Sequence, residues 1–122
     1  MQVTSFNINL TSADPNRLVA FYRDVVQLPA NEQMGEGTFD VGGAQLLIDG
    51  HSDITGPTQE PARVLINLFV DDLAAEQQRL EAQGARFIRT AGREYWGGVI
   101  STFLDPDGNK LEIYAGPGAK PA

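Results

Sequence analysis

The stretch DVGGAQLLI (residues 40–48) decides the fold, because DPDGNKLEI (residues 105–113) repeats its pattern 65 positions further along. Each stretch joins a turn signal, Gly42-Gly43 in the first and residues 105–109 in the second, to a run of alternating apolar residues. That combination is typical of a β-hairpin whose second strand is buried on one face. We therefore expect two copies of one structural unit.

The repeat extends upstream of the two hairpins. Ile8-Asn9-Leu10 reappears as Ile66-Asn67-Leu68, and the same shift of 58 residues carries Asp14 onto Asp72. Each aspartate precedes apolar residues at helical spacing, as an N-cap residue would. The shift is 58 residues for the strand and the cap but 65 for the hairpin, so the second copy has seven extra residues. We assign them to an insertion over 90–97. Matched caps and hairpins in the same order predict an internal duplication.

Each half is expected to contain a strand, a helix and further strands. In the first half the patterns predict a strand over 2–11, a helix from Asp14-Pro15 to about Gln27, and hairpin strands over 38–41 and 44–49. In the second half they predict a strand over 63–70, a helix from Asp71-Asp72 to Gln83, a strand over 85–90, and hairpin strands over 99–104 and 110–114.

The elements group into two modules of a single domain. Module one is expected over residues 1–50 and module two over residues 62–116, joined by a linker over 51–61 that contains two prolines and a glycine. The domain as a whole is expected over 1–116. The Gly- and Pro-rich residues 117–122 are expected to form a flexible tail.

Alternation along each strand predicts which side chains a covering helix would bury. In the first strand Phe6, Ile8 and Leu10 are expected under the helix, and in the strand over 63–70 Val64, Ile66, Leu68 and Val70. The opposite face then carries Ser5, Asn7, Asn9, Gln45, Leu47, Asp49, Arg63, Leu65, Asn67, Phe69, Lys110, Glu112 and Tyr114. One unit alone would leave this face in water, so we expect two units to curl around a shared cup.

Composition excludes several classes of function. Sixteen acidic and nine basic residues give the 122-residue chain a net charge of -7, which argues against binding to nucleic acid or to an anionic membrane surface. There is no cysteine for a disulfide or thiolate site, and a single histidine rules out a two-histidine metal site within one chain. No apolar run approaches the length of a membrane span, so a cytoplasmic protein is expected.

Several motifs together resemble the vicinal oxygen chelate superfamily, which comprises glyoxalases, bleomycin resistance proteins and extradiol dioxygenases. The motifs are FYRDVVQL (21–28), FVDDL (69–73), LEAQGA (80–85), WGG (96–98) and FLDPDGNKLE (103–112). The resemblance implies an α+β fold of two tandem βαβββ modules, whose mixed sheet forms a cup with helices on its outer face. It also implies a homodimer.

Members of this superfamily that carry out chemistry hold a divalent metal at four cup positions, and these map onto Asn7, Leu47, Leu65 and Glu112. Among them only Glu112 is a common metal ligand, since leucine has no donor atom and asparagine offers one neutral oxygen. Asp49 could replace Leu47 after a register slip, which would still leave two carboxylates and an amide. We therefore expect neither a metal nor another cofactor.

The candidate ligand-binding residues lie on the cup face or above it. Glu112 is the candidate catalytic base or cation-binding carboxylate, with partial solvation beside Lys110 or Arg63 as its alternative. Trp96 could stack on a ligand or pack at an interface, and the asparagines could bind a ligand or one another. The full set is Asn7, Asn9, Leu47, Asp49, Leu65, Asn67, Phe69, Trp96, Glu112 and Tyr114.

The leading hypothesis is a protein of the glyoxalase and bleomycin-resistance type that binds and sequesters a small cationic or aromatic molecule without a metal. One alternative is a metal-dependent lyase, isomerase or dioxygenase with a degenerate site built on Glu112. Another is a structural dimer with a vestigial cup. The sequence leaves open the ligand, whether any reaction is catalysed, and whether the modules pair within one chain or between two.

Overall fold

The computed structural model describes the backbone of residues 1–120 and the side chains of residues 1–115. The chain divides into two compact units, one spanning Met1–Pro57 and the other beginning at Thr58. Each unit is a small mixed sheet with a helix, which gives an α+β fold as predicted.

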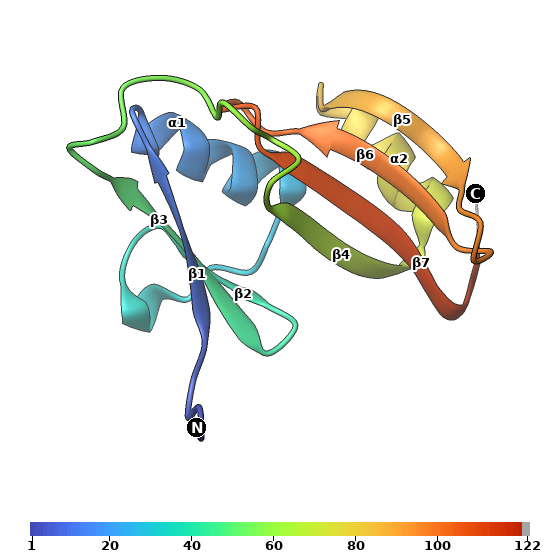
Figure 1. The fold of residues 1–122 in the computed structure, drawn as a ribbon, viewed down its shortest axis with the longest axis horizontal. Helices are drawn as coiled ribbons and strands as arrows, with labels where there is room; N and C mark the ends of the chain where they lie inside the picture. The colour runs from blue at the N-terminus through green and yellow to red at the C-terminus, as the bar shows by residue number, and fades with distance from the viewer. Residues whose placement is uncertain (121–122) are drawn as a thin grey trace. The chain divides into compact units, whose positions relative to one another are not determined.

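The first unit contains a three-stranded sheet in which β3 lies between β1 and β2 (Figure 1). β1 runs parallel to β3, and β2 runs antiparallel to it. Leu46 and Ile48 of the central strand are buried, whereas Asp49, near the C-terminal end of the same strand, is exposed. The elements are β1 (Asn7–Ser12), α1 (Pro15–Ala20), η1 (Phe21–Val26), η2 (Glu32–Met34), β2 (Thr38–Val41) and β3 (Ala44–Gly50).

The first unit departs from the expected βαβββ order, because its fourth strand is reduced to one bridge between Ala30 and Phe39. Two hydrogen bonds flank the bridge: Asn31 donates its backbone N–H to Thr38, and Asp40 donates to Pro29, each at 2.8 Å. Pro29 has no N–H to extend the pairing, and the chain turns away into η2 directly afterwards. The correction is therefore a βαββ unit with a vestigial strand.

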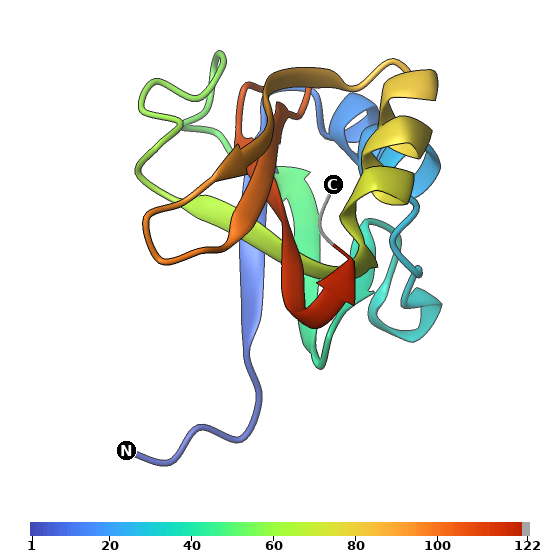
Figure 2. The ribbon, with the colours of Figure 1, turned by 90° about the vertical axis from the view of Figure 1, so that its right-hand side faces the viewer.

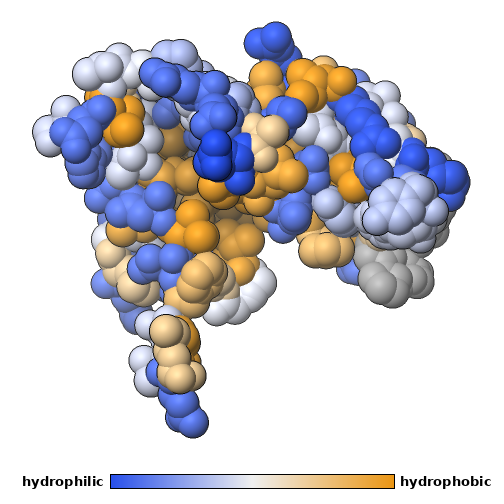
Figure 3. Space-filling view, in the orientation of Figure 1, coloured by the Kyte–Doolittle hydropathy of each residue, from blue (hydrophilic) through white to orange (hydrophobic). Residues whose placement is uncertain are grey.

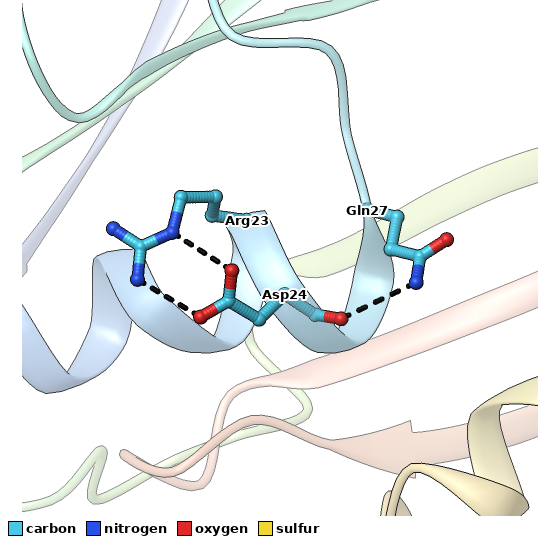
Figure 4. Close-up of polar contacts among 3 residues, drawn as sticks. All are labelled: Arg23, Asp24 and Gln27. Carbon is cyan, nitrogen blue, oxygen red and sulfur yellow. Dashed lines mark hydrogen bonds and ion pairs between the residues drawn. The ribbon is translucent and has the colours of Figure 1, made fainter.

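The first helix has the predicted extent but changes from an α-helix to a π-helix partway along. Asp14 caps it by accepting a hydrogen bond from the N–H of Arg17, and α1 continues into the π-helical segment η1. On the surface of η1 Arg23 forms two hydrogen bonds to the Asp24 carboxylate, at 2.8 and 2.9 Å (Figure 4). This hydrogen-bonded ion pair raises the pKa of Arg23 and lowers that of Asp24. The helix ends at Gln27, whose φ of 65° is left-handed and whose amide donates to the Asp24 carbonyl.

The second unit contains a four-stranded sheet in the order β4-β7-β6-β5 (Figure 1). Figure 2 shows α2 against one face of this sheet. Neither this helix nor any other in the described part of the chain is long and apolar enough to cross a membrane. The elements are β4 (Leu65–Asp72), α2 (Leu73–Ala82), β5 (Arg86–Arg93), β6 (Val99–Leu104) and β7 (Lys110–Lys120).

Polar groups fix α2 on its sheet. Asp72 caps the helix by accepting from the N–H of Ala75 at 3.1 Å, and Gly84 follows its C-terminus with φ +88°. The hydroxyl of Ser101, which is fully buried, donates to the Gln77 side chain at 2.6 Å and accepts from the N–H of Ala91 at 2.8 Å. Since Ser101 lies on β6 and Gln77 on α2, the helix-facing side of β6 is fixed.

The strand registers support the predicted duplication. Asn9 pairs with Leu47 in the first unit, and Asn67 pairs with Glu112 in the second, which reproduces the shifts of 58 and 65. The antiparallel pairs require one refinement, since Thr38 corresponds to Thr102, a shift of 64. Six extra residues therefore precede β6 and one lies in the hairpin turn, instead of all seven within 90–97.

Three apolar residues are more exposed than predicted. β1 begins at Asn7 instead of Gln2, and Phe6 and Ile8 are 59% and 38% exposed. α1 turns back over the C-terminal end of β1, where Leu10 is half-buried and Ser12 buried, so the short helix leaves the start of the strand uncovered. Val64 is 60% exposed because it precedes β4, whose Ile66, Leu68 and Val70 follow the predicted alternation.

The C-terminal strand extends further than the predicted hairpin strand. β7 runs to Lys120 and so includes residues 117–120, which the sequence analysis assigned to a tail. Asp72 pairs with Lys120 after a register shift in the ladder between β4 and β7. Residues 121–122 of the expected tail lie outside the described residues.

Gly37 is a position where the fold requires glycine. Its φ is +86°, and a Cβ there would lie 2.7 Å from the carbonyl oxygen of Ile48. We expect Gly37→Ala to lower the free energy of unfolding by about 1–3 kcal/mol, through backbone strain and displacement of β3. Chemical denaturation measures this. Gly56→Ala is the control, because a Cβ at Gly56 meets no atom within 4 Å; equal stability of the two variants would contradict the prediction.

Candidate ligand-binding site

The register between β4 and β7 gathers five of the ten candidate residues on one sheet face of the second unit, and the turn before β6 adds Trp96. Asn67 pairs with Glu112 and Phe69 with Tyr114, while Leu65 lies beside Lys110. Leu111 and Ile113 are buried on the α2 side, so the intervening Glu112 and Tyr114 point to the opposite face. This surface, on strands β4, β7, β6 and β5 away from α2, is called the open face below.

An aromatic row crosses the open face. The ring centroids of Phe69 and Tyr114 are 4.8 Å apart, and those of Tyr114 and Trp96 are 6.2 Å apart with an interplanar angle of 24°. Phe69 is 66% exposed and Trp96 is 55% exposed, so the row offers ring faces to solvent. Figure 3, in the orientation of Figure 1, shows apolar and polar surface interspersed over the second unit. A row of exposed rings can bind a planar or cationic molecule.

The turn before β6 places Trp96 on the open face. Glu94 donates its N–H to the Gly98 carbonyl at 2.7 Å, Gly97 donates back to Glu94 at 2.9 Å, and Gly97 has φ +92°. A Cβ at Gly98 would lie 1.8 Å from the Trp96 ring, so the indole packs directly against the glycine backbone. Each glycine of the pair is therefore required for a different reason: Gly97 adopts the left-handed backbone of the turn, and Gly98 leaves room for the Trp96 ring.

Glu112 lies beside the aromatic row, between Asn67 on β4 and Thr102 on β6. The Tyr114 hydroxyl donates a hydrogen bond to the Glu112 carboxylate at 3.0 Å. Burial, and then this hydrogen bond and the nearby carboxylates of Glu112 and Glu94, raise the pKa of Tyr114. Tyr114 is therefore a neutral donor near pH 7, and it orients the carboxylate.

Arg89 also lies on the open face, although the sequence analysis did not select it. It pairs with Thr102 across the sheet, and its guanidinium lies where a Cβ of Gly92 would stand. There it forms an ion pair with Glu94 at 2.5 Å. This ion pair links β5 to Glu94, at the start of the turn that carries Trp96. An arginine three residues before a glycine in an edge strand would have been the only sequence signal.

The other four candidate residues lie in the first unit. Asn9 pairs with Leu47, Asn7 with Gln45, and Asp49 with Thr11. Leu47 is half-buried and lies on the side of β3 away from the buried Leu46 and Ile48, as predicted. Thr38, which lies beside Leu47, has a buried hydroxyl without a hydrogen-bond partner among the described residues. The prediction that these four residues bind a ligand stays a prediction.

The residues at the four family metal positions do not fit a divalent transition metal. Leu47 and Leu65 have only alkyl side chains, and Asn7 supplies one neutral oxygen. Glu112 supplies the single carboxylate, and that carboxylate already accepts the Tyr114 hydrogen bond. Zinc, nickel and iron sites in proteins use three or more strong donors.

A separate cleft lies in the first unit, and the sequence analysis missed it. It encloses about 340 Å³ between η1 and the segment that leads into β2. Gly35 and Gly37, with φ +106° and +86°, set the path of that segment. No periodic pattern in the sequence encodes such a path. The lining residues are Val19, Arg23, Ala30, Glu32, Gly35, Glu36, Gly37, Thr38 and Phe39.

Comparison with protein families agrees with the fold. The model of the Glyoxalase/Bleomycin resistance protein/Dioxygenase superfamily matches residues 5–113, and this chain belongs to that superfamily. The family prediction from the sequence motifs is confirmed. Membership defines the architecture without defining a reaction, because one fold hosts many functions.

Solved structures resemble the chain over nearly its whole length. A protein of unknown function from Agrobacterium tumefaciens str. C58 shares 28% identity with TM-score 0.71, covering 96% of this chain and 98% of that one. A lactoylglutathione lyase from Agrobacterium tumefaciens shares 22% identity with TM-score 0.71, covering 95% and 96%. A superfamily member from Sphaerobacter thermophilus DSM 20745 shares 17% with TM-score 0.72, covering 94% and 98%. No curated protein matches the chain significantly.

The packing of Trp96 on Gly98 can be tested with the intrinsic fluorescence of the chain, which contains one tryptophan. We expect Gly98→Ala to displace the indole from Tyr114, because the added methyl group would overlap the ring. The emission spectrum should shift to longer wavelength and iodide quenching should increase, while stability stays close to that of the wild type. Gly56→Ala should leave both signals unchanged. Identical spectra for Gly98→Ala and wild type would refute the packing.

The hydrogen bond between Tyr114 and Glu112 predicts an alkaline titration. Because the pKa of Tyr114 is raised in the folded protein, its contribution to stability is fully present below the pKa of an unfolded tyrosine, about 10. That contribution is lost as pH rises through the higher folded value. We expect Glu112→Gln to lower the pKa of Tyr114, measured by phenolate absorbance with Tyr114→Phe as the assignment control. An unchanged titration in Glu112→Gln would contradict the assigned contact.

Proposed function

We propose that this protein binds a small aromatic cation on the open face of its second unit, without a metal, and acts by sequestering it. The observation that carries the proposal is the aromatic row of Phe69, Tyr114 and Trp96 beside the oriented carboxylate of Glu112. Rings with exposed faces attract organic cations, and a carboxylate at their edge supplies the opposite charge.

The chemistry of Glu112 supports binding over catalysis. A carboxylate that accepts the Tyr114 hydrogen bond is suited to pairing with an ammonium group. Use of Glu112 as the base of a glyoxalase-type lyase or isomerase would need an electrophilic partner to stabilise the developing negative charge. The leucines at two of the four metal positions cannot hold one. Enzymatic activity with a degenerate metal site is thus the alternative that the experiment below must exclude.

Two further properties belong to the proposal. Ile8 on the edge strand β1 and Phe6 just before it expose apolar surface, which favours pairing with a second copy and a homodimer. The absence of cysteine is compatible with a cytoplasmic location. A homodimer would bury these two side chains. A vestigial, non-binding open face is the remaining alternative.

Titration with phenethylammonium tests the proposal. We expect saturable binding, followed by Trp96 fluorescence and by calorimetry, and about tenfold weaker binding by Glu112→Gln, because the ammonium loses its counter-charge. The neutral analogue 2-phenylethanol should bind the wild type as weakly as phenethylammonium binds the variant. Protein treated with a chelator should bind unchanged.

Glu81→Gln is the matched control, because Glu81 is an exposed carboxylate on α2, on the other side of the sheet. Equal affinities of wild type and Glu112→Gln would reject the proposed site. A requirement for a stoichiometric transition metal, lost in Glu112→Gln, would favour the enzymatic alternative. The absence of any saturable response would favour a vestigial face.

A further inference from the structure

Two basic residues lie in one row at the end of the open face farthest from the aromatic row. Arg86 on β5 pairs with Leu104, Leu104 pairs with Lys110, and Lys110 pairs with Leu65 on β4. Residues paired across adjacent strands point to the same side of a sheet. Arg86 and Lys110 therefore share the open face with Glu112, although neither was a candidate in the sequence analysis.

Both cations are available to a ligand. Among the residues whose side chains the structure describes, Arg86 and Lys110 form no ion pair, whereas Arg89 on the same face is paired with Glu94. Arg86 is exposed and Lys110 is half-buried. In a chain of net charge -7, two unpaired cations in one row of a sheet face form a local positive site.

The open face thus has three chemically different rows in a fixed order. Arg86 and Lys110 form the first row, Glu112 lies two residues further along β7, and Tyr114 lies two residues beyond that. Two residues along a strand span about 7 Å, so the aromatic row lies roughly 14 Å from the basic row at the backbone. Arg and Lys side chains are long enough to shorten this separation from one end, and the indole of Trp96, which stacks on Tyr114, marks the other end.

We infer that the ligand of the open face is an aromatic zwitterion of about dipeptide length, with its ring on Phe69, Tyr114 and Trp96, its ammonium at Glu112, and a terminal carboxylate between Arg86 and Lys110. The inference rests on the proposed function and adds the anionic end of the ligand. A carboxylate fits better than a phosphate, because two side chains are the only donors at this row: the backbone N–H groups lie in the plane of the sheet and do not point out of its face.

Two probes that differ in the carboxylate test the inference. Phenethylammonium has a ring and an ammonium group, and phenylalanylglycine adds a terminal carboxylate. The wild type should bind phenylalanylglycine about tenfold more tightly than phenethylammonium, and the double variant Arg86→Gln/Lys110→Gln should lose that gain while binding phenethylammonium at least as tightly as the wild type does. Raised salt should weaken phenylalanylglycine binding in the wild type more than in the double variant.

Arg93→Gln is the matched control, because Arg93 lies on the same strand as Arg86 but pairs with Val99, on the α2 side of the sheet. It should bind both probes as the wild type does. The inference is overturned if phenylalanylglycine gains nothing over phenethylammonium, if the double variant keeps the gain, or if Arg93→Gln loses it equally. Failure of the proposed function is a distinct result: Glu112→Gln would then bind phenethylammonium with the affinity of the wild type.

Discussion

Parallel pairing between the first and last strand of each unit determines which side chains its sheet buries and which it exposes. In both units the last strand lies beside the first, β3 beside β1 and β7 beside β4. Each helix covers one face of its sheet, so the alternation of side chains assigns every residue to the helix side or to the other side. A slip of one residue would exchange Glu112 with the buried Leu111 or Ile113 and would place a charge under α2.

The second unit keeps its buried core and its exposed side chains on opposite faces of the sheet. The α2 side of its sheet holds the buried Leu111, Ile113 and Phe103, together with the hydrogen-bonded Ser101. The open face holds rings, a carboxylate and cations that contribute little to the core. Glycines in β5 and before β6 let the side chains of Arg89 and Trp96 lie across the backbone. Chemistry on this face can therefore vary without loss of the fold.

The sequence predicted the features that depend on periodicity. The duplication, both helix caps, the two hairpins and the side of each strand that faces a helix follow from spacing, and the structure agrees with them. The sequence analysis was wrong about burial at the start of β1, because no local sequence pattern shows that α1 is too short to cover Phe6 and Ile8. It also missed Arg86 and Lys110 as partners in one row, because cross-strand register depends on a bulge in β5 that the sequence pattern does not reveal.

Under the proposed function, the ligand binds the open face of the second unit and not the cleft of the first. Amide chemical shifts of ¹⁵N-labelled protein during titration with phenethylammonium test it most directly. We expect the perturbed amides to belong to β4, β7 and residues 94–98, and we expect Glu112→Gln to suppress the changes. Perturbations centred on residues 30–39, around the cleft lined by Glu32 and Glu36, would contradict it.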